Sequence, residues 1–141
     1  MKALTLTQPW ATLVAIGAKR IETRSWSTKY RGPLAIHAAK GFPRDARDMM
    51  RHPSFCKVLH PRGFTSADHL PLGVVLAICE LYDCRGTWSI NYADLDPAEY
   101  DFGNYAEGRF AFFLRNVVEL EPVSIKGALG LWEIAGEWTG P

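Results

Sequence analysis

The feature that most restricts the possible folds is an apolar stretch at residues 73–82, GVVLAICELY. It is far too short to cross a bilayer as a helix, and its composition is typical of a strand buried on both faces near its start. A second stretch, RFAFFLRNVV, occupies 109–118, and shorter patterns occupy 3–6, 34–38 and 131–135. The sequence therefore predicts a sheet of five or six strands.

Short helices are expected between these strands. Pro9 and Gly17 stand at the two ends of a segment with apolar residues at helical spacing, which predicts a helix there with a glycine stop. A polar helix is expected over 40–51 and is predicted to end at Pro53, because the residue before a proline disfavours helical backbone. The pair Asp96-Pro97 indicates one further helical turn.

Two segments lack a strand pattern. Residues 52–71 contain three prolines and are interpreted as an irregular surface excursion. Residues 83–108 are polar, acidic and aromatic, and their length suggests a functional flap or lid. Because helices and strands do not alternate as βαβ units, the expected class is α+β: a small mixed β-barrel with two or three short helices. With 141 residues, the chain is expected to form one domain, 1–141.

The composition indicates the class of protein and the compartment in which it is expected. Apolar residues make up 48% and charged residues 22%, as in ordinary soluble proteins. The three cysteines, Cys56, Cys79 and Cys84, form no C-x-x-C pair and leave one unpaired under any disulfide scheme, which favours free thiols in a reducing compartment. No stretch resembles a signal peptide or a membrane span. The expected location is therefore cytoplasmic, with no membrane partner.

Charge is distributed unequally along the chain. Residues 1–62 carry twelve Lys and Arg against three Asp and Glu, and residues 63–141 carry four against twelve, which gives +9 and −8. Local positive potential attracts phosphates whatever the net charge, so the first half is a candidate for a polyanionic partner. The alternative is that the two halves interleave in one fold and leave only a modest dipole.

The most charged part of the first half is residues 17–26, GAKRIETRSW. If this stretch is extended, the period of two places Glu22, Arg24 and Trp26 on one face. Lys19 precedes Glu22 by three residues and could reach the same face. The sequence thus predicts a Lys/Glu/Arg cluster beside an indole, with a solvated surface ion-pair network as the alternative.

Two kinds of chemistry fit this cluster. A partly desolvated Lys19 could act as a base or nucleophile with Glu22 orienting it or shuttling a proton. The same cations could instead hold a phosphate, and Trp26 or Tyr30, with Arg31 beside it, could stack on a base. Binding requires less tuning of the groups, so we rank it above catalysis.

A metal site is a weaker candidate. His52, Cys56 and His60 lie at four-residue steps, but Pro53 and Pro61 interrupt the helix that would align them, and no suitable fourth ligand follows. There is no Gly-rich phosphate loop and no G-x-S-x-G motif. We therefore expect no metal and no cofactor.

Several motifs together resemble the ASCH domain, named for homology to activating signal cointegrator 1. They are the opening TQPWA at 7–11, the motif G-x-K-x-x-E-x-R-S-W at 17–26, RGPL at 31–34, KG at 126–127 and LWE at 131–133. The resemblance implies a PUA-like fold, which is a small β-barrel with helices at its ends. It also implies a cleft for RNA, single-stranded nucleic acid or a modified nucleotide, with Lys19, Glu22 and Arg24 on that cleft.

Some small bacterial relatives in this family are amidohydrolases that deacetylate N4-acetylcytidine, and others have been assigned ribonuclease activity. In the amidohydrolase pattern a threonine stands three residues after the lysine, and here Glu22 occupies that position. Thr23 is adjacent but is expected to point to the opposite face of an extended strand. The predicted function is therefore nucleic-acid binding by Lys19, Glu22, Arg24, Trp26, Tyr30 and Arg31. The alternative is an amidohydrolase or ribonuclease that uses Lys19 and Glu22.

Overall fold

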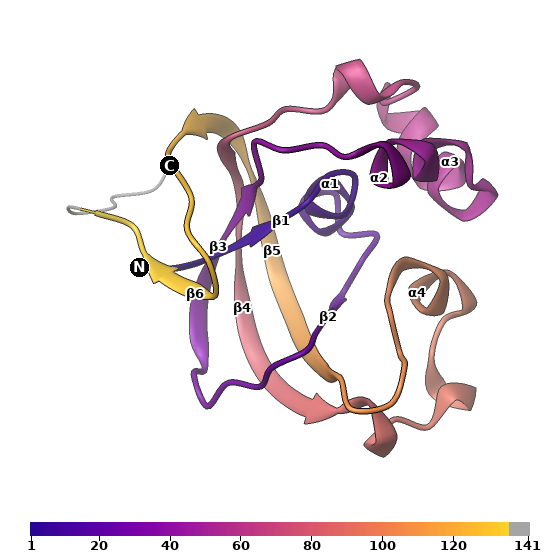
Figure 1. Ribbon diagram of the computed structural model, residues 1–141, viewed down its shortest axis with the longest axis vertical. Coiled ribbons are helices and arrows are strands. Elements are labelled where there is room, and N and C mark those ends of the chain that lie inside the picture. The colour runs from indigo at the N-terminus through magenta and orange to yellow at the C-terminus, as the bar shows by residue number, and fades with distance from the viewer. Residues whose placement is uncertain (136–141) are drawn as a thin grey trace.

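The computed structural model describes residues 1–135 and shows one six-stranded sheet (Figure 1). Its strand order is β2-β5-β4-β3-β1-β6, in which β1 and β3 run parallel and every other pair is antiparallel. The strands are β1 (Lys2–Leu6), β2 (Ile21–Arg24), β3 (Gly32–Ala38), β4 (Val74–Gly86), β5 (Phe110–Ser124) and β6 (Leu131–Glu133). All five predicted strands are present, and residues 21–24 supply the sixth.

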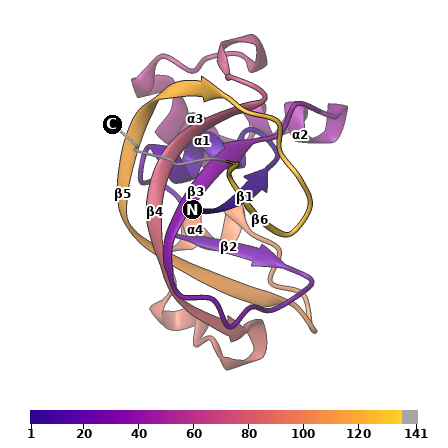
Figure 2. The ribbon, with the colours of Figure 1, turned by 90° about the vertical axis from the view of Figure 1, so that its left-hand side faces the viewer.

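Strands β4 and β5 are longer than the apolar pattern predicts. Residues 83–86 continue β4 and 119–124 continue β5, so part of the predicted flap and an expected connecting segment belong to the sheet. The pairing between the two strands shifts register at three places. Because each extra residue bends and twists a strand locally, the shifts curl the sheet into a half-barrel. Figure 2 shows β4 and β5 curving together around α1.

Four short α-helices lie on the concave side of the curl (Figures 1 and 2): α1 (Trp10–Ala15), α2 (Arg44–Asp48), α3 (Pro53–Leu59) and α4 (Pro97–Phe102). Within residues 1–135 this is one helix more than the two or three expected. The interpretation of 52–71 as irregular chain was wrong, because Pro53 begins α3 instead of only ending the preceding helix. A missing N–H costs nothing at a first helical position, and His52 Nδ1 accepts the N–H of Ser54 at 3.2 Å.

Two apolar clusters pack the helices against the sheet and against one another. The main core lies between the sheet and α1 and includes Leu6, Val14 and Phe112. A second core joins α1, α3 and α4, where Phe55 is fully buried and its ring meets that of Phe102 at 5.0 Å, edge to face. The second core fixes α4 opposite β2, and this placement determines the geometry of the site described below. Among residues 1–135, every helix is too short or too polar to cross a bilayer.

Candidate functional site

The charged stretch 17–26 connects α1 to β2. Gly17 adopts a left-handed conformation with φ +80°, which ends α1 and turns the chain. The side chain of Lys19 then enters the interior and is completely buried. Its Nζ donates to the carbonyl oxygens of Ile21 and of Phe102, the latter at 3.3 Å, and lies 3.5 Å from Glu22 Oε1. Three oxygens thus surround the ammonium group, two of them as hydrogen-bond acceptors and one as its ionic partner.

Glu22 connects this buried lysine to Arg24. The Nε of Arg24 donates to Glu22 Oε2 at 3.1 Å, and its Nη2 lies 3.0 Å from the same oxygen. Nη2 also donates to the backbone oxygen of Thr5 in β1 at 2.7 Å. Glu22 and Arg24 therefore lie on the same face of β2, as the period of two predicts, and the surface ion-pair alternative does not describe Lys19.

The opposite wall is built by α4 and the chain that follows it. Glu99 of α4 is 6% exposed, and its carboxylate accepts the backbone N–H of Ile21 at 2.9 Å and that of Arg20 at 3.0 Å. Burial raises the pKa of Glu99, while the two N–H donors and the charge of Lys19 act in the opposite direction. Arg109 donates to the backbone oxygens of Asn104 and Thr23, at 3.1 and 3.2 Å. The N–H of Asn104 also donates to Thr23 Oγ1 at 2.9 Å, so the later part of the predicted flap is attached to β2 and to the residue before it.

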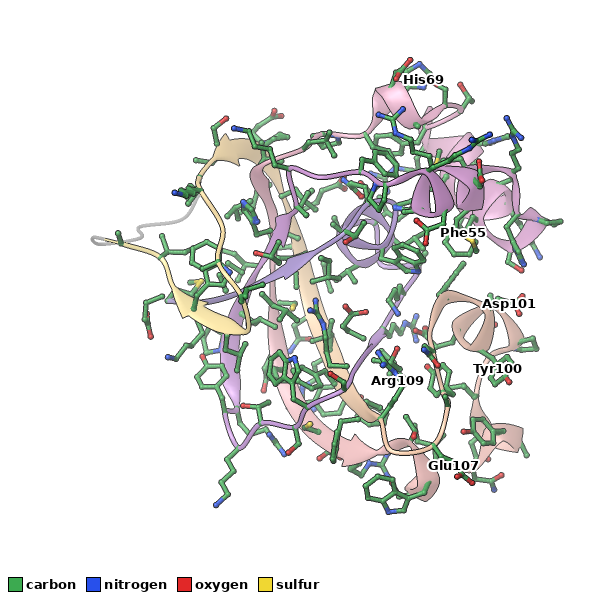
Figure 3. All side chains as sticks on the ribbon, in the orientation of Figure 1. Phe55, His69, Tyr100, Asp101, Glu107 and Arg109 are labelled. Atoms are coloured by element: carbon green, nitrogen blue, oxygen red, sulfur yellow. The ribbon has the colours of Figure 1, made fainter. Side chains whose placement is uncertain are left out.

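Between β2 and α4 lies a pocket of about 430 Å³, hereafter the β2–α4 pocket. Its lining includes the side chains of Glu22, Arg24, Asp101 and Arg109, together with the indole of Trp10. Figure 3 labels Asp101 on α4 and Arg109 between β2 and the chain that leads from α4 into β5. The lining thus combines two arginines, two acidic residues and one tryptophan. The pocket carries mixed charge and is not uniformly basic.

Three predicted binding residues lie away from this pocket. The ring of Trp26 packs edge to face on Phe112 at 5.1 Å, against the main core. The hydroxyl of Tyr30 donates to the carbonyl oxygen of Pro33, and Arg31 lies 3.7 Å from Asp83. The structure brings Glu22 and Arg24 together in the β2–α4 pocket and Lys19 directly behind it, but not Trp26, Tyr30 or Arg31.

Sequence reasoning missed Glu99, Arg109 and Trp10. A signal for Glu99 existed, because it stands three residues after the helix cap Asp96, the position of a capping-box acid. The carboxylate instead reaches across to β2. In residues 1–135 no three His, Cys, Asp or Glu side chains gather as metal ligands would. Of the zinc candidates, His52 caps α3 and Cys56 Sγ contacts the Met50 carbonyl oxygen at 3.0 Å.

The sequence profile of the ASCH domain matches residues 4–124. The chain belongs to the ASCH domain family. This ASCH domain is 28% identical over 132 residues to mouse activating signal cointegrator 1 and 28% identical over 134 residues to the human protein. The matches cover 93% of this chain but only 22% of each relative, so the chain spans about a fifth of their length.

Solved structures show the same fold. The ASCH protein of Zymomonas mobilis superimposes with a TM-score of 0.50 at 18% identity, covering 88% of this chain and 73% of that one. A tyrosine-to-phenylalanine mutant of that protein gives a TM-score of 0.50 at 15% identity, with 88% and 75% covered. The family profile confirms the predicted ASCH domain, and the solved structures confirm the predicted small α+β fold, whose expected β-barrel is a curled half-barrel here.

Proposed function

We propose that this ASCH domain binds single-stranded RNA and receives one nucleobase in the β2–α4 pocket. Its volume of about 430 Å³ lies in the range of small-molecule sites and is suited to one nucleoside. RNA-binding proteins read unpaired bases by stacking on aromatic rings and by hydrogen bonds to base edges. Trp10 offers the ring surface, and the charged residues around it offer donors and acceptors.

One observation carries this proposal, namely the rigid Glu22–Arg24 pair at the wall of the pocket. Arg24 is fixed through Nε and Nη2, while its Nη1 has no partner among residues 1–135 and is available to a carbonyl oxygen of a base. Glu22 retains lone pairs for an exocyclic amino group. Mixed donors and acceptors suit a base edge better than a phosphate, so in this proposal Lys19 supports Glu22 and does not contact the ligand.

Substitution of Arg24 tests the proposal. We expect Arg24→Gln to weaken binding of a fluorescein-labelled single-stranded RNA of about ten nucleotides by at least about tenfold, or roughly 1.4 kcal/mol. Fluorescence anisotropy at low salt measures the affinity, and thermal unfolding verifies that the variant remains folded. Arg44→Gln is the matched control, because it removes an exposed arginine from α2. Equal affinities of Arg24→Gln and the wild type would rule out base recognition in this pocket.

The hydrolase alternative requires Lys19 or Glu22 to touch the substrate. Lys19 is completely buried, its Nζ donates to two backbone carbonyl oxygens and pairs with Glu22, and of the two residues only Glu22 lines the pocket. This geometry favours binding over nucleophilic chemistry at the lysine. An assay of N4-acetylcytidine and RNA with the same protein preparations separates the two functions, because turnover abolished by Glu22→Gln in a folded protein would support the enzyme.

A further inference from the structure

A second cavity of about 900 Å³ adjoins the β2–α4 pocket, and Thr5 lines both. Lys40 and Lys126 line this second cavity, hereafter the lysine cavity, and no carboxylate does among residues 1–135. Neither lysine forms an ion pair within the same range, whereas Arg24 in the β2–α4 pocket is paired with Glu22. The acidic and basic residues that line the β2–α4 pocket balance in number, so the net positive charge lies next to this pocket and not inside it.

The backbone around Lys126 is held on both sides. His37, which is 2% exposed, donates from Nε2 to the Ile125 carbonyl oxygen at 2.6 Å. Gly127 packs so closely that a Cβ added there would lie 2.6 Å from His37 Cε1 and 2.8 Å from Thr5 Oγ1. Because both neighbours of Lys126 are fixed against the buried His37, the lysine projects from a fixed backbone and not from a free loop.

A chain of hydrogen bonds extends this support to Thr5. The indole N–H of Trp132 donates to Thr5 Oγ1 at 3.0 Å, and that hydroxyl donates to His37 Nδ1 at 3.0 Å. Because the Ile125 carbonyl oxygen can only accept, His37 carries its proton on Nε2 and its Nδ1 is the acceptor, so the three bonds are mutually consistent. Thr5 is thus anchored at the point where the two cavities meet.

The second lysine, Lys40, lies two residues after the end of β3, and the backbone just before it is held by hydrogen bonds. Next to Lys40, the N–H of Ala39 donates to the Leu6 carbonyl oxygen at 2.9 Å, and the N–H of Gly73 donates to that of Ala38 at 2.9 Å. Leu72 and Leu129 add apolar surface to the same cavity. Two cations and an apolar wall match a nucleotide, which combines an anionic phosphate with the apolar faces of a sugar and a base.

We infer that the lysine cavity is a phosphate subsite, in which Lys40 and Lys126 hold the backbone phosphate of the nucleotide next to the base in the β2–α4 pocket. The inference rests on the proposed function and extends it: the RNA strand passes Thr5, one base is read on the β2 side, and the adjoining phosphate is neutralised on the β3 side. Full affinity accordingly requires an oligonucleotide of at least two residues, and a free nucleoside binds more weakly.

The salt dependence of RNA binding tests the inference. We expect the double variant Lys40→Ala/Lys126→Ala to bind the labelled single-stranded RNA at least about tenfold more weakly in low salt. The slope of log affinity against log salt should decrease by roughly 0.7 for each phosphate that the variant no longer neutralises. Arg44→Ala/Lys57→Ala is the matched control, because it removes two exposed cations on α2 and α3 without touching the lysine cavity.

A nucleoside without phosphate separates this inference from the proposed function. Nucleoside binding, followed by NMR chemical shifts, should be unchanged in the lysine double variant and abolished in Arg24→Gln. If RNA affinity and salt slope are the same in the double variant and the wild type, the phosphate subsite is excluded, whatever Arg24→Gln does. If Arg24→Gln leaves RNA affinity unchanged but the double variant lowers it, the phosphate subsite is supported and base recognition in the β2–α4 pocket is excluded.

Gly127→Ala gives a second test that keeps both lysines. The added methyl group must displace the backbone around Lys126 from His37 and Thr5, so we expect weaker RNA binding at unchanged net charge. The indole N–H signal of Trp132, which reports its bond to Thr5 Oγ1, should shift in the same variant. A shifted indole signal with RNA affinity equal to the wild type would contradict the placement of Lys126 at a phosphate.

Discussion

Replacing Lys19 by methionine is expected to lower the free energy of unfolding by about 3–5 kcal/mol, the cost of removing one member of a buried charge pair. Methionine fills a similar volume but offers no N–H bonds. The carbonyl oxygens of Ile21 and Phe102 then lose their donor, and Glu22 loses a cationic partner. Since Lys19 is completely buried, water cannot replace it without a rearrangement of α4 or β2.

Urea unfolding followed by circular dichroism measures this loss, with Lys29→Met as the control because Lys29 is exposed. The prediction fails if both variants unfold at the same urea concentration. The result also decides how a loss of RNA binding or catalysis in a Lys19 variant should be interpreted. A Lys19 variant that loses RNA binding or catalysis would lose it through the fold, so such a loss assigns no chemical role to the ammonium unless the stability is measured in parallel.

Removing the Glu99 carboxylate is the second large effect expected. Glu99→Ala leaves the backbone N–H groups of Arg20 and Ile21 without their acceptor, at a cost of about 2–4 kcal/mol in the free energy of unfolding. It also detaches α4 from β2, so the wall of the β2–α4 pocket moves and RNA affinity falls together with stability. Asp94→Ala is the control, because Asp94 is an exposed acid of the same segment. Equal unfolding midpoints for the two variants would contradict the role assigned to Glu99.

The contribution of Glu99 depends on pH with a defined sign. Burial raises the pKa of this carboxyl in the folded chain above its ordinary value. The folded state therefore binds the proton more tightly than the unfolded state, so this contribution is greatest below the ordinary pKa and falls as pH rises through the raised one. Relative to Glu99→Gln, the wild type should lose stability on going from about pH 4 to about pH 8. A stability difference that is constant over this range would contradict the sign.

Local sequence was sufficient where a single element decides the geometry. The apolar stretches 73–82 and 109–118 predict the two long strands, because their composition and length are those of buried strands. The period of two places Glu22 and Arg24 on one face of β2, where they form an ion pair. Gly17 marks the end of α1 because few other residues adopt its backbone conformation. Each of these signals lies within a few residues of its effect.

The tertiary structure decided which of these residues share a site. Lys19 is buried because the Phe102 carbonyl oxygen, 83 residues further along the chain, lies above it. Phe102 is held there by its contact with Phe55 on a third element. The contact of Glu99 with Ile21 spans 78 residues of sequence. The contact of His37 with Ile125, which positions the neighbouring Lys126, spans 88 residues. Local periodicity carries no information on such contacts, because they depend on how separate elements pack. The sequence thus predicted the Glu22–Arg24 pair, and only the packing of α4 and the 125–130 loop placed that pair between a buried lysine and a second, positively charged cavity.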